Sequence, residues 1–288
     1  MVMDEFEQIV DKLCEASRKQ FVNPYEYLEW PKQLDPEQWC TSPELISLYG
    51  TESYEGLPEA QRKRLSFYEA VNFFSLNIHG EKSLVEGLAQ RVYRKSNAVI
   101  TPYLHHFLDE ENKHMVYFGS FCKRYANKVY PDRKMVVPRE FAPGEEDFLF
   151  FTKVMVFEEV VDVYNLRMSN DERLVPIARQ INQIHHREEA RHLVFGREIV
   201  KRLFDHYAPT WSPETLRGIR EYLQGYIVAT WKEYYNPDVY KDAGLQDPYG
   251  IQQCAFDHER CRAHRRQVSE KCLGYLIENG LLEQEPTL

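Results

Sequence analysis

Two short segments of the chain place a glutamate and a histidine three residues apart. "LDEENKHMVYFG" contains Glu111 and His114, and "REEARHLVFG" contains Glu189 and His192. Residues three or four positions apart lie on one face of an α-helix, so each pair can direct a carboxylate and an imidazole toward one cation. A single pair of this kind is common by chance in an acidic helical chain. Two pairs on separate helices indicate the two halves of one metal site.

A third histidine extends the second of these segments. His185 precedes Glu189 by four residues, so at ~100° per residue His185, Glu189 and His192 share one helical face. Three potential ligands on one face exceed what chance spacing explains. Other polar residues of this segment are predicted to point elsewhere, toward solvent or the surroundings of a ligand: His186, Glu188 and Arg191.

Further carboxylates are predicted to face the interior. Glu81 belongs to an apolar stripe spaced by three and four residues, which also contains Phe74, Ile78, Val85 and Leu88. Glu86 falls outside this stripe and stays the alternative. In "FLFFTKVMVFEEVVDVYN" the periodicity does not decide between Glu158 and Glu159, and we favour Glu158. Because burying an unpaired carboxylate is expensive, each inward glutamate needs a partner.

The order of these residues matches a known ligand set. One glutamate from each of two helices, with Glu-x-x-His from each of two others, is the set of ferritin-like di-iron or di-manganese carboxylate proteins. Carboxylates mixed with imidazoles favour iron over zinc or calcium, because they can bridge two metals and tolerate a change of oxidation state. The chain order is Glu81, Glu111 with His114, Glu158, and Glu189 with His192.

At these residues the chain resembles the AurF-like di-iron N-oxygenases, the family of para-aminobenzoate N-oxygenase. The resemblance covers residues 65 to 235 and rests on ligand order and on the additional histidine of "HHREEARH". It implies a metal site of seven ligands, namely Glu81, Glu111, His114, Glu158, His185, Glu189 and His192.

The resemblance also implies an activity. Two Fe ions would use O2 as co-substrate to oxidise the amine nitrogen of a small molecule to a hydroxylamine and onward to a nitro group, in secondary metabolism. The implied partners are the amine substrate and an external electron donor, either a protein or another reductant. Other O2-dependent oxidations (hydroxylation, desaturation or C–C cleavage) are the nearest alternative. A non-catalytic iron-binding ferritin-like protein and a metal-free helical interaction protein are the others.

Three polar side chains are predicted to hydrogen-bond the ligands, since a metal-bound histidine usually has an acceptor on its other nitrogen. These are Asp162, Tyr117 and Tyr164. Asp162 is the foremost of them, because an aspartate on so apolar a helix requires a partner. A stripe of Cys254, His258, Cys261 and His264 looks like a second metal site, but along one helix it would span ~15 Å, too far for one ion.

The elements that must position these residues are long helices. Glycine is scarce, with 13 residues, and apolar residues recur at helical spacing. We predict an all-α, ferritin-like four-helix bundle with additional N- and C-terminal helices. The bundle helices are predicted at 58–95, 102–127, 145–168 and 174–207, and later helices at 213–235, capped by Ser212, and 251–279. Residues 1–57 are predicted to form an arm on the bundle, 58–210 the di-iron core, and 211–288 helices that complete the same domain.

Charge and composition limit the kinds of partner and the cellular location that we expect for the chain. The formal net charge is -9 without a one-sided Lys/Arg cluster, which argues against a nucleic-acid partner. The most apolar stretch, "FLFFTKVMVFEEVV", carries charged residues, and the N-terminus lacks a signal-peptide pattern, so we expect a cytoplasmic protein with no membrane partner. The six cysteines are scattered without CxxC and are expected to be reduced. The oligomeric state stays open, with a homodimer as one option.

Overall fold

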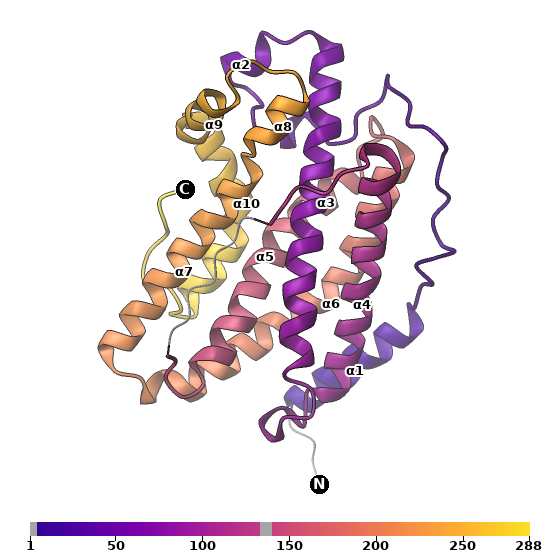
Figure 1. Cartoon of the computed structure of the whole chain (residues 1–288). Helices are drawn as coiled ribbons and strands as arrows, with labels where there is room; N and C mark the ends of the chain where they lie inside the picture. The colour runs from indigo at the N-terminus through magenta and orange to yellow at the C-terminus, as the bar shows by residue number, and fades with distance from the viewer. Residues whose placement is uncertain (1–4, 133–139) are drawn as a thin grey trace.

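The computed structural model describes residues 5–132 and 140–288, and four long helices form its centre. Figure 1 shows them side by side: α3 (Glu59–Ala89), α4 (Thr101–Phe121), α5 (Glu145–Ser169) and α6 (Pro176–Tyr207). The most extensive packing joins α3 to α4 and α5 to α6, each pair running antiparallel. Within the described ranges, β-structure is limited to an isolated bridge between Trp39 and Leu174. The predicted all-α, ferritin-like bundle is confirmed.

The bundle helices begin close to the predicted positions, but α3 and α4 end earlier than predicted. α3 ends at Ala89 instead of residue 95, because Tyr93 has a left-handed backbone with φ of 61°. α4 ends at Phe121 and continues as a π-helical turn over Cys122–Ala126. Asn127 then adopts φ of 46°, a conformation that asparagine tolerates better than most residues.

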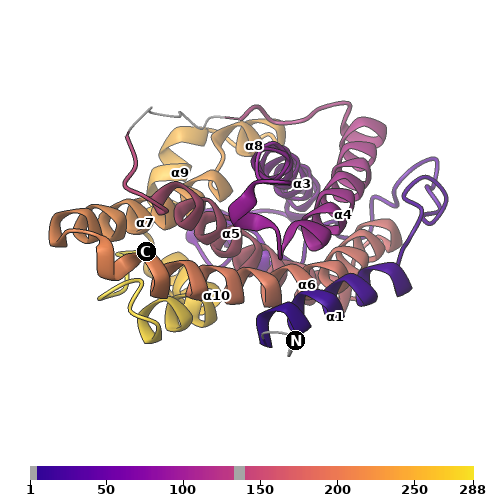
Figure 2. The same cartoon turned by 90° about the horizontal axis from the view of Figure 1, so that it is seen from below.

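An N-terminal arm wraps the bundle. Its helix α1 (Glu5–Lys19) packs on α4 and α6, as Figure 2 shows from below. The irregular segment that follows leads to the short helix α2 (Glu52–Glu55). Trp39 fastens this segment to the start of α6, since its N–H donates to Arg173 O at 3.1 Å and its carbonyl accepts from Val175 N at 2.8 Å.

The C-terminal helices cover the other side, where α5 contacts α7 (Pro213–Tyr234) and α10 (Glu259–Glu278). Ser212 caps α7 as predicted, since its Oγ accepts from Thr215 N at 3.1 Å. A short helix, α8 (Pro237–Asp242), follows. The predicted single helix at 251–279 is wrong, because α9 (Pro248–Asp257) and α10 are separate helices. His258 interrupts them with an extended backbone and caps α10 through Arg260 N at 3.3 Å.

This break removes the geometric basis of the Cys/His stripe. Cys254 is exposed on α9, whereas Cys261 is buried on α10, and His258 lies in the junction between them. None of these residues belongs to a metal-compatible cluster in the part of the chain that the structure describes. The described helices also include none that is both long and apolar enough to cross a membrane.

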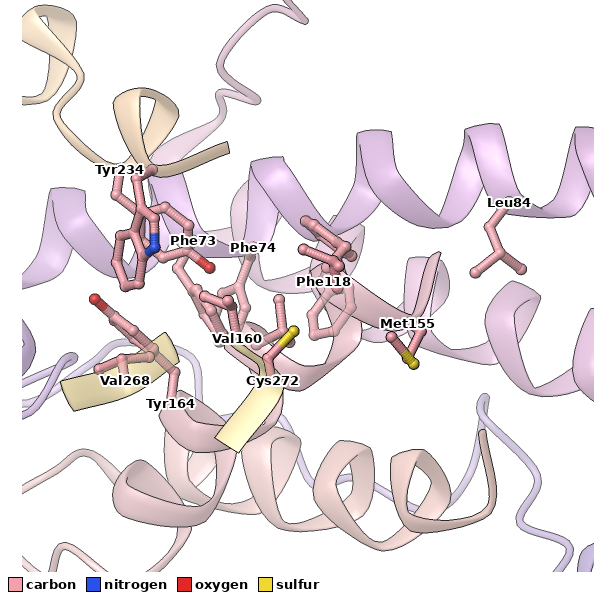
Figure 3. Close-up of a cluster of buried hydrophobic side chains, with 14 of the residues drawn as sticks. Phe73, Phe74, Leu84, Phe118, Met155, Val160, Tyr164, Tyr234, Val268 and Cys272 are labelled. Atoms are coloured by element: carbon pink, nitrogen blue, oxygen red, sulfur yellow. The ribbon is translucent and has the colours of Figure 1, made fainter. Parts of the chain in front are cut away.

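The bundle interior is aromatic around its polar centre. Figure 3 shows buried apolar side chains of α3, α4 and α5. The rings of Phe74 and Phe118 stack there, with their centroids 5.3 Å apart. Gly80 sits beside Glu81 on α3, and a Cβ there would lie 2.6 Å from the ring of Phe157, the neighbour of Glu158 on α5. The glycine therefore allows α3 and α5 to approach closely at the level of the two glutamates.

Candidate metal centre

Six of the seven predicted ligands meet in one buried polar cluster, to which α3, α4 and α6 contribute. Each side chain belongs to a residue that is at most 2% exposed. Ligand atoms lie within 4.8 Å of one another in two overlapping groups, the first formed by Glu81, His114, His185 and Glu189, the second by Glu111, Glu189 and His192. Glu158 lies beside these groups, and the charges of Glu189 and Glu111 act on its carboxyl group.

The histidines present different ring nitrogens to the cluster. His114 Nδ1 lies 3.2 Å from Glu111 Oε2, and His192 Nδ1 lies 2.8 Å from Glu111 Oε1. His185 uses the other nitrogen, with Nε2 2.7 Å from Glu189 Oε1. Two histidines therefore face the cluster through Nδ1 and one through Nε2.

Two of the glutamates lie between the two groups. One oxygen of Glu111 faces His114 and the other faces His192. Glu189 likewise divides its oxygens, with Oε1 3.5 Å from His114 Nδ1 and Oε2 3.3 Å from His192 Nδ1. Glu81 belongs only to the group with His114. Two cations in this cluster could share Glu111 and Glu189, with one further carboxylate at each end.

The electrostatics of the cluster reflect many charges in a small buried volume. Burial raises the pKa of Glu81 well above its ordinary value, and the carboxylate of Glu111 raises it further. Burial also raises the pKa of Glu158, and the charge of Glu189 adds to this shift. Burial acts in the same direction on Glu111, but His192 and His114, with the hydrogen bonds from Glu81 and His114, together outweigh it and hold the pKa of Glu111 well below its usual range. Cations among these carboxylates would relieve their mutual repulsion.

The buried ligand atoms fit metal ions better than they fit one another. The following have no hydrogen-bond partner among the described residues: Glu81 Oε2, Glu111 Oε1, both carboxylate oxygens of Glu158 and Glu189, His185 Nε2 and His192 Nδ1. Even the close pairs, such as His192 Nδ1 and Glu111 Oε1, lack hydrogen-bond geometry. An unpaired buried polar group costs about 1–3 kcal/mol, so the convergence of several of them indicates a cation site.

The structure also decides between the glutamates that were alternatives in the sequence, Glu158 or Glu159 on α5 and Glu81 or Glu86 on α3. Glu158 is buried with both oxygens unpaired, whereas Glu159 accepts from Arg197 Nε at 2.6 Å on another side of α5. Glu81 is 1% exposed and lies in the cluster, whereas Glu86 is exposed to solvent. Of these four glutamates, Glu81 and Glu158 are therefore the two that face the metal cluster.

Two further glutamates support the histidines: Glu110, which the spacing did not single out, and Glu188, for which solvent and the surroundings of a ligand were both left open. Glu188 Oε2 lies 3.0 Å from His114 Nε2, and Glu110 Oε2 lies 2.8 Å from His192 Nε2. Both are buried, at 0% and 2% exposure. Arg191, expected to point elsewhere with Glu188, is also buried and donates to Glu110 Oε1 at 2.7 Å.

The third histidine has an amide partner instead. His185 Nδ1 lies 2.8 Å from Asn165 Nδ2, and Asn165 Oδ1 has no partner among the described residues. If His185 Nε2 binds a cation, its Nδ1 carries the proton and must donate. The amide of Asn165 then takes the rotated orientation, with Oδ1 as the acceptor, because oxygen and nitrogen of an amide are interchangeable in shape.

None of the three predicted supporting residues hydrogen-bonds a ligand in the described part of the chain, so this prediction is wrong. Asp162 Oδ1 pairs with His186 Nδ1 at 2.6 Å, so this aspartate satisfies a histidine outside the cluster. Tyr164 OH lies 3.3 Å from His264 Nε2. Tyr117 OH is buried without a hydrogen-bond partner in the described part of the chain. A signal for the true supporting residues exists in the sequence, since "EENKH" and "EEARH" repeat Glu-Glu-x-basic-His.

A four-helix bundle with carboxylates and histidines on its inner faces defines the ferritin-like class. The structure resembles an R2-like ligand-binding oxidase with an aerobically reconstituted Mn/Fe cofactor after a long soak, with a TM-score of 0.51, 13% identity, and coverage of 99% of this chain and 95% of that chain. It similarly resembles an R2-like ligand-binding oxidase with an aerobically reconstituted metal cofactor after photoconversion, with a TM-score of 0.51, 14% identity, and coverage of 97% and 93%. These likenesses establish the fold.

Within this class the chain belongs to the p-aminobenzoate N-oxygenase AurF family, whose model matches residues 3–280. The resemblance noted for residues 65 to 235 is thus confirmed and extends over nearly the whole chain. Relatives include the uncharacterized proteins Rv0885 of Mycobacterium tuberculosis and Mb0909 of Mycobacterium bovis. Each is 23% identical over 252 residues, covering 81% of this chain and 74% of the relative.

Proposed function

We propose that the protein is a di-iron oxygenase that uses O2 to oxidise the amine nitrogen of a small molecule to a hydroxylamine, and onward to a nitro group, in secondary metabolism. The observation that carries this proposal is the convergence of unpaired buried carboxylate and imidazole atoms in two overlapping groups. Membership of the AurF family supports the nitrogen as the oxidised atom. A Mn/Fe pair is the nearest alternative metal content, because the structural neighbours are described with that cofactor.

Each metal ion would have its own ligands and two shared ones. The first would be held by Glu81, His114 and His185, and the second by Glu158 and His192. Glu111 and Glu189 would serve both ions. When bound, such a pair supplies a centre that binds O2 and exchanges electrons with it.

The residues around the ligands would keep water away from the reaction. The ring of Phe107 lies 4.0 Å from that of His192, and the ring of Phe118 lies 4.9 Å from that of His185. A dry site of this kind protects a reactive oxidant from side reactions with solvent. Inserting one oxygen atom from O2 into an N–H bond releases the other as water and consumes two electrons and two protons. An external electron donor is therefore a required partner.

Metal loading is the first test of this function. Purified protein is incubated anaerobically with Fe(II), desalted and analysed for iron, and we expect two iron ions per chain. Fewer than one iron per chain would exclude the di-iron proposal and favour a helical protein whose acidic core is only ion-paired.

Product analysis is the second test. The reduced, loaded protein is mixed with O2 and a panel of arylamines, and hydroxylamine and nitro products are sought by mass spectrometry. Oxidation at carbon would support the alternative oxidase, and iron uptake without any oxidised product would support an iron-binding ferritin-like protein. Either result would overturn the N-oxygenase proposal.

A further inference from the structure

The two ligand-bearing helices carry the same local pattern. "EENKH" on α4 ends in His114, and "EEARH" on α6 ends in His192. In each segment the second glutamate belongs to the metal cluster, while the first glutamate and the basic residue do not. The pattern therefore contains two residues per helix for which the proposed metal ligation has no use.

These additional residues connect the two helices crosswise. Glu110 on α4 contacts His192 Nε2 on α6 at 2.8 Å, and Glu188 on α6 contacts His114 Nε2 on α4 at 3.0 Å. Each histidine is thus held by the glutamate that precedes the ligand glutamate of the opposite helix. The arrangement is reciprocal, and we call these two contacts the cross-braces.

The basic residues stabilise the charge of the cross-braces. Arg191 donates to Glu110 Oε1 at 2.7 Å, and Lys113 donates to Glu188 Oε1 at 3.2 Å. Both side chains are almost fully buried, at 7% and 3% exposure. A buried carboxylate with an adjacent cation and an imidazole N–H has both of its oxygens satisfied.

Two residues of the N-terminal arm contact the basic side chains of the cross-braces. Gln20 Oε1 accepts from Arg191 Nη1 at 2.6 Å, and the ring of Phe21 lies 5.0 Å from Lys113 Nζ. These two neighbouring arm residues therefore cover the two basic side chains. The cross-braces form one buried layer between the arm and the metal cluster.

We infer that Glu110 and Glu188 are positioning residues that make the two metal positions fill together, an inference that rests on the proposed di-iron function. A cation bound by His192 fixes that ring and, through Glu110, the turn of α4 that carries Glu111. Glu111 faces both groups of ligands, so its ordering prepares the other position as well. The second cross-brace acts in the same way on Glu189.

The remaining histidine provides an internal contrast. His185 is held by the neutral amide of Asn165, which comes from α5 and is not adjacent to a shared carboxylate. A carboxylate partner increases the basicity of a bound imidazole more than an amide does. Loss of the Asn165 contact should therefore weaken metal binding at the position that contains His185 and leave binding at the other position unchanged.

The test uses Co(II) as the probe, because its d–d absorption distinguishes a position with two imidazoles from one with a single imidazole. Glu110→Gln and Glu188→Gln keep the side-chain shape and remove the charge. Glu159→Gln is the matched control, since Glu159 is buried beside a proposed ligand and, among the residues that the structure describes, forms its ion pair with Arg197. Competition with a chelator measures both affinities, and circular dichroism confirms the helical fold of each variant.

We expect each cross-brace variant to bind Co(II) 10 to 100 times more weakly at both positions, the usual effect of removing such a partner, and the control to bind like the parent protein. Weakening at only the position whose histidine lost its partner would overturn joint filling. Affinities equal to those of the control would overturn the positioning role altogether. If the parent protein binds no metal, the proposed function fails instead, which is a distinguishable result.

A variant that does not fold is replaced by Glu110→Asp or Glu188→Asp, which keeps the charge and shortens the reach. Because the hydrogen bond to the histidine is then stretched while the ion pair can persist, the same weakening at both positions is expected. Unchanged affinity in these variants would likewise contradict the positioning role.

Discussion

The close approach of α3 and α5 at the metal cluster leads to a prediction about Gly80. Replacing it with alanine gains helix propensity of about 1 kcal/mol, as for any glycine inside a helix. The new Cβ, however, would lie 2.6 Å from the ring of Phe157, so the ring or the helix must move. Overpacking of this kind costs about 1–3 kcal/mol. The net effect of Gly80→Ala is therefore a loss of about 0–2 kcal/mol.

Gly225 supplies the matched control on α7. A Cβ added there meets no atom within 4 Å, so Gly225→Ala should show the propensity gain alone. The two variants should then differ by the overpacking cost of about 1–3 kcal/mol, or roughly 2–12 °C in Tm for a chain of this size. Thermal unfolding followed by circular dichroism measures this difference. If Gly80→Ala is as stable as Gly225→Ala, the reasoning about the helix contact is refuted.

Three further predictions concern the metal site and a buried acid. His185→Ala should lower amine oxidation more than Cys261→Ala, as turnover assays would show, and equal losses would contradict the assignment of His185 as a ligand. Metal-loaded protein should unfold at a higher temperature than chelator-treated protein, because a ligand at 100 times its Kd adds about 2.7 kcal/mol, and an unchanged Tm would count against a buried site. Burial raises the pKa of Glu69 to about 7 from its ordinary value of 4.5, with Ser47 opposing the shift through its hydroxyl. Between pH 4.5 and 7, Glu69 keeps its proton in the folded state and loses it in the unfolded state. The free energy of unfolding therefore decreases as the pH rises through this interval. Glu69→Gln should thus gain stability relative to the parent protein by about 3 kcal/mol over that range, and denaturant titrations showing a pH-independent difference would exclude this account.

Much of the bundle is predictable because helical periodicity is a local property. The apolar stripes and Pro positions predict α5 and α6 to within two residues of their observed ends. Helical spacing similarly predicts which side chains share a face, and the structure brings the ligand atoms of six of the seven predicted residues together, with Glu158 within reach of their charges. The errors fall where a single backbone torsion decides the outcome, as at Tyr93 and His258.

The choice between neighbouring residues depends on the packing of other helices. Glu158 and Glu159 are equivalent in the sequence, but Arg197 of α6 satisfies one of them and leaves the other facing the cluster. Asp162 is a plausible partner for any histidine within reach, and the structure gives it His186. Local spacing cannot supply such partners, because they come from residues far away in the chain.

The sequence by itself determined the helical fold class and which residues share one face of each helix. Both depend on the repeat of a single helix, which holds wherever that helix is placed. The tertiary structure decided how the two Glu-Glu-x-basic-His segments meet, so that Glu110 supports His192 and Glu188 supports His114. The crossing exists only when α4 and α6 lie antiparallel at one particular height, and that register results from the packing of the whole bundle.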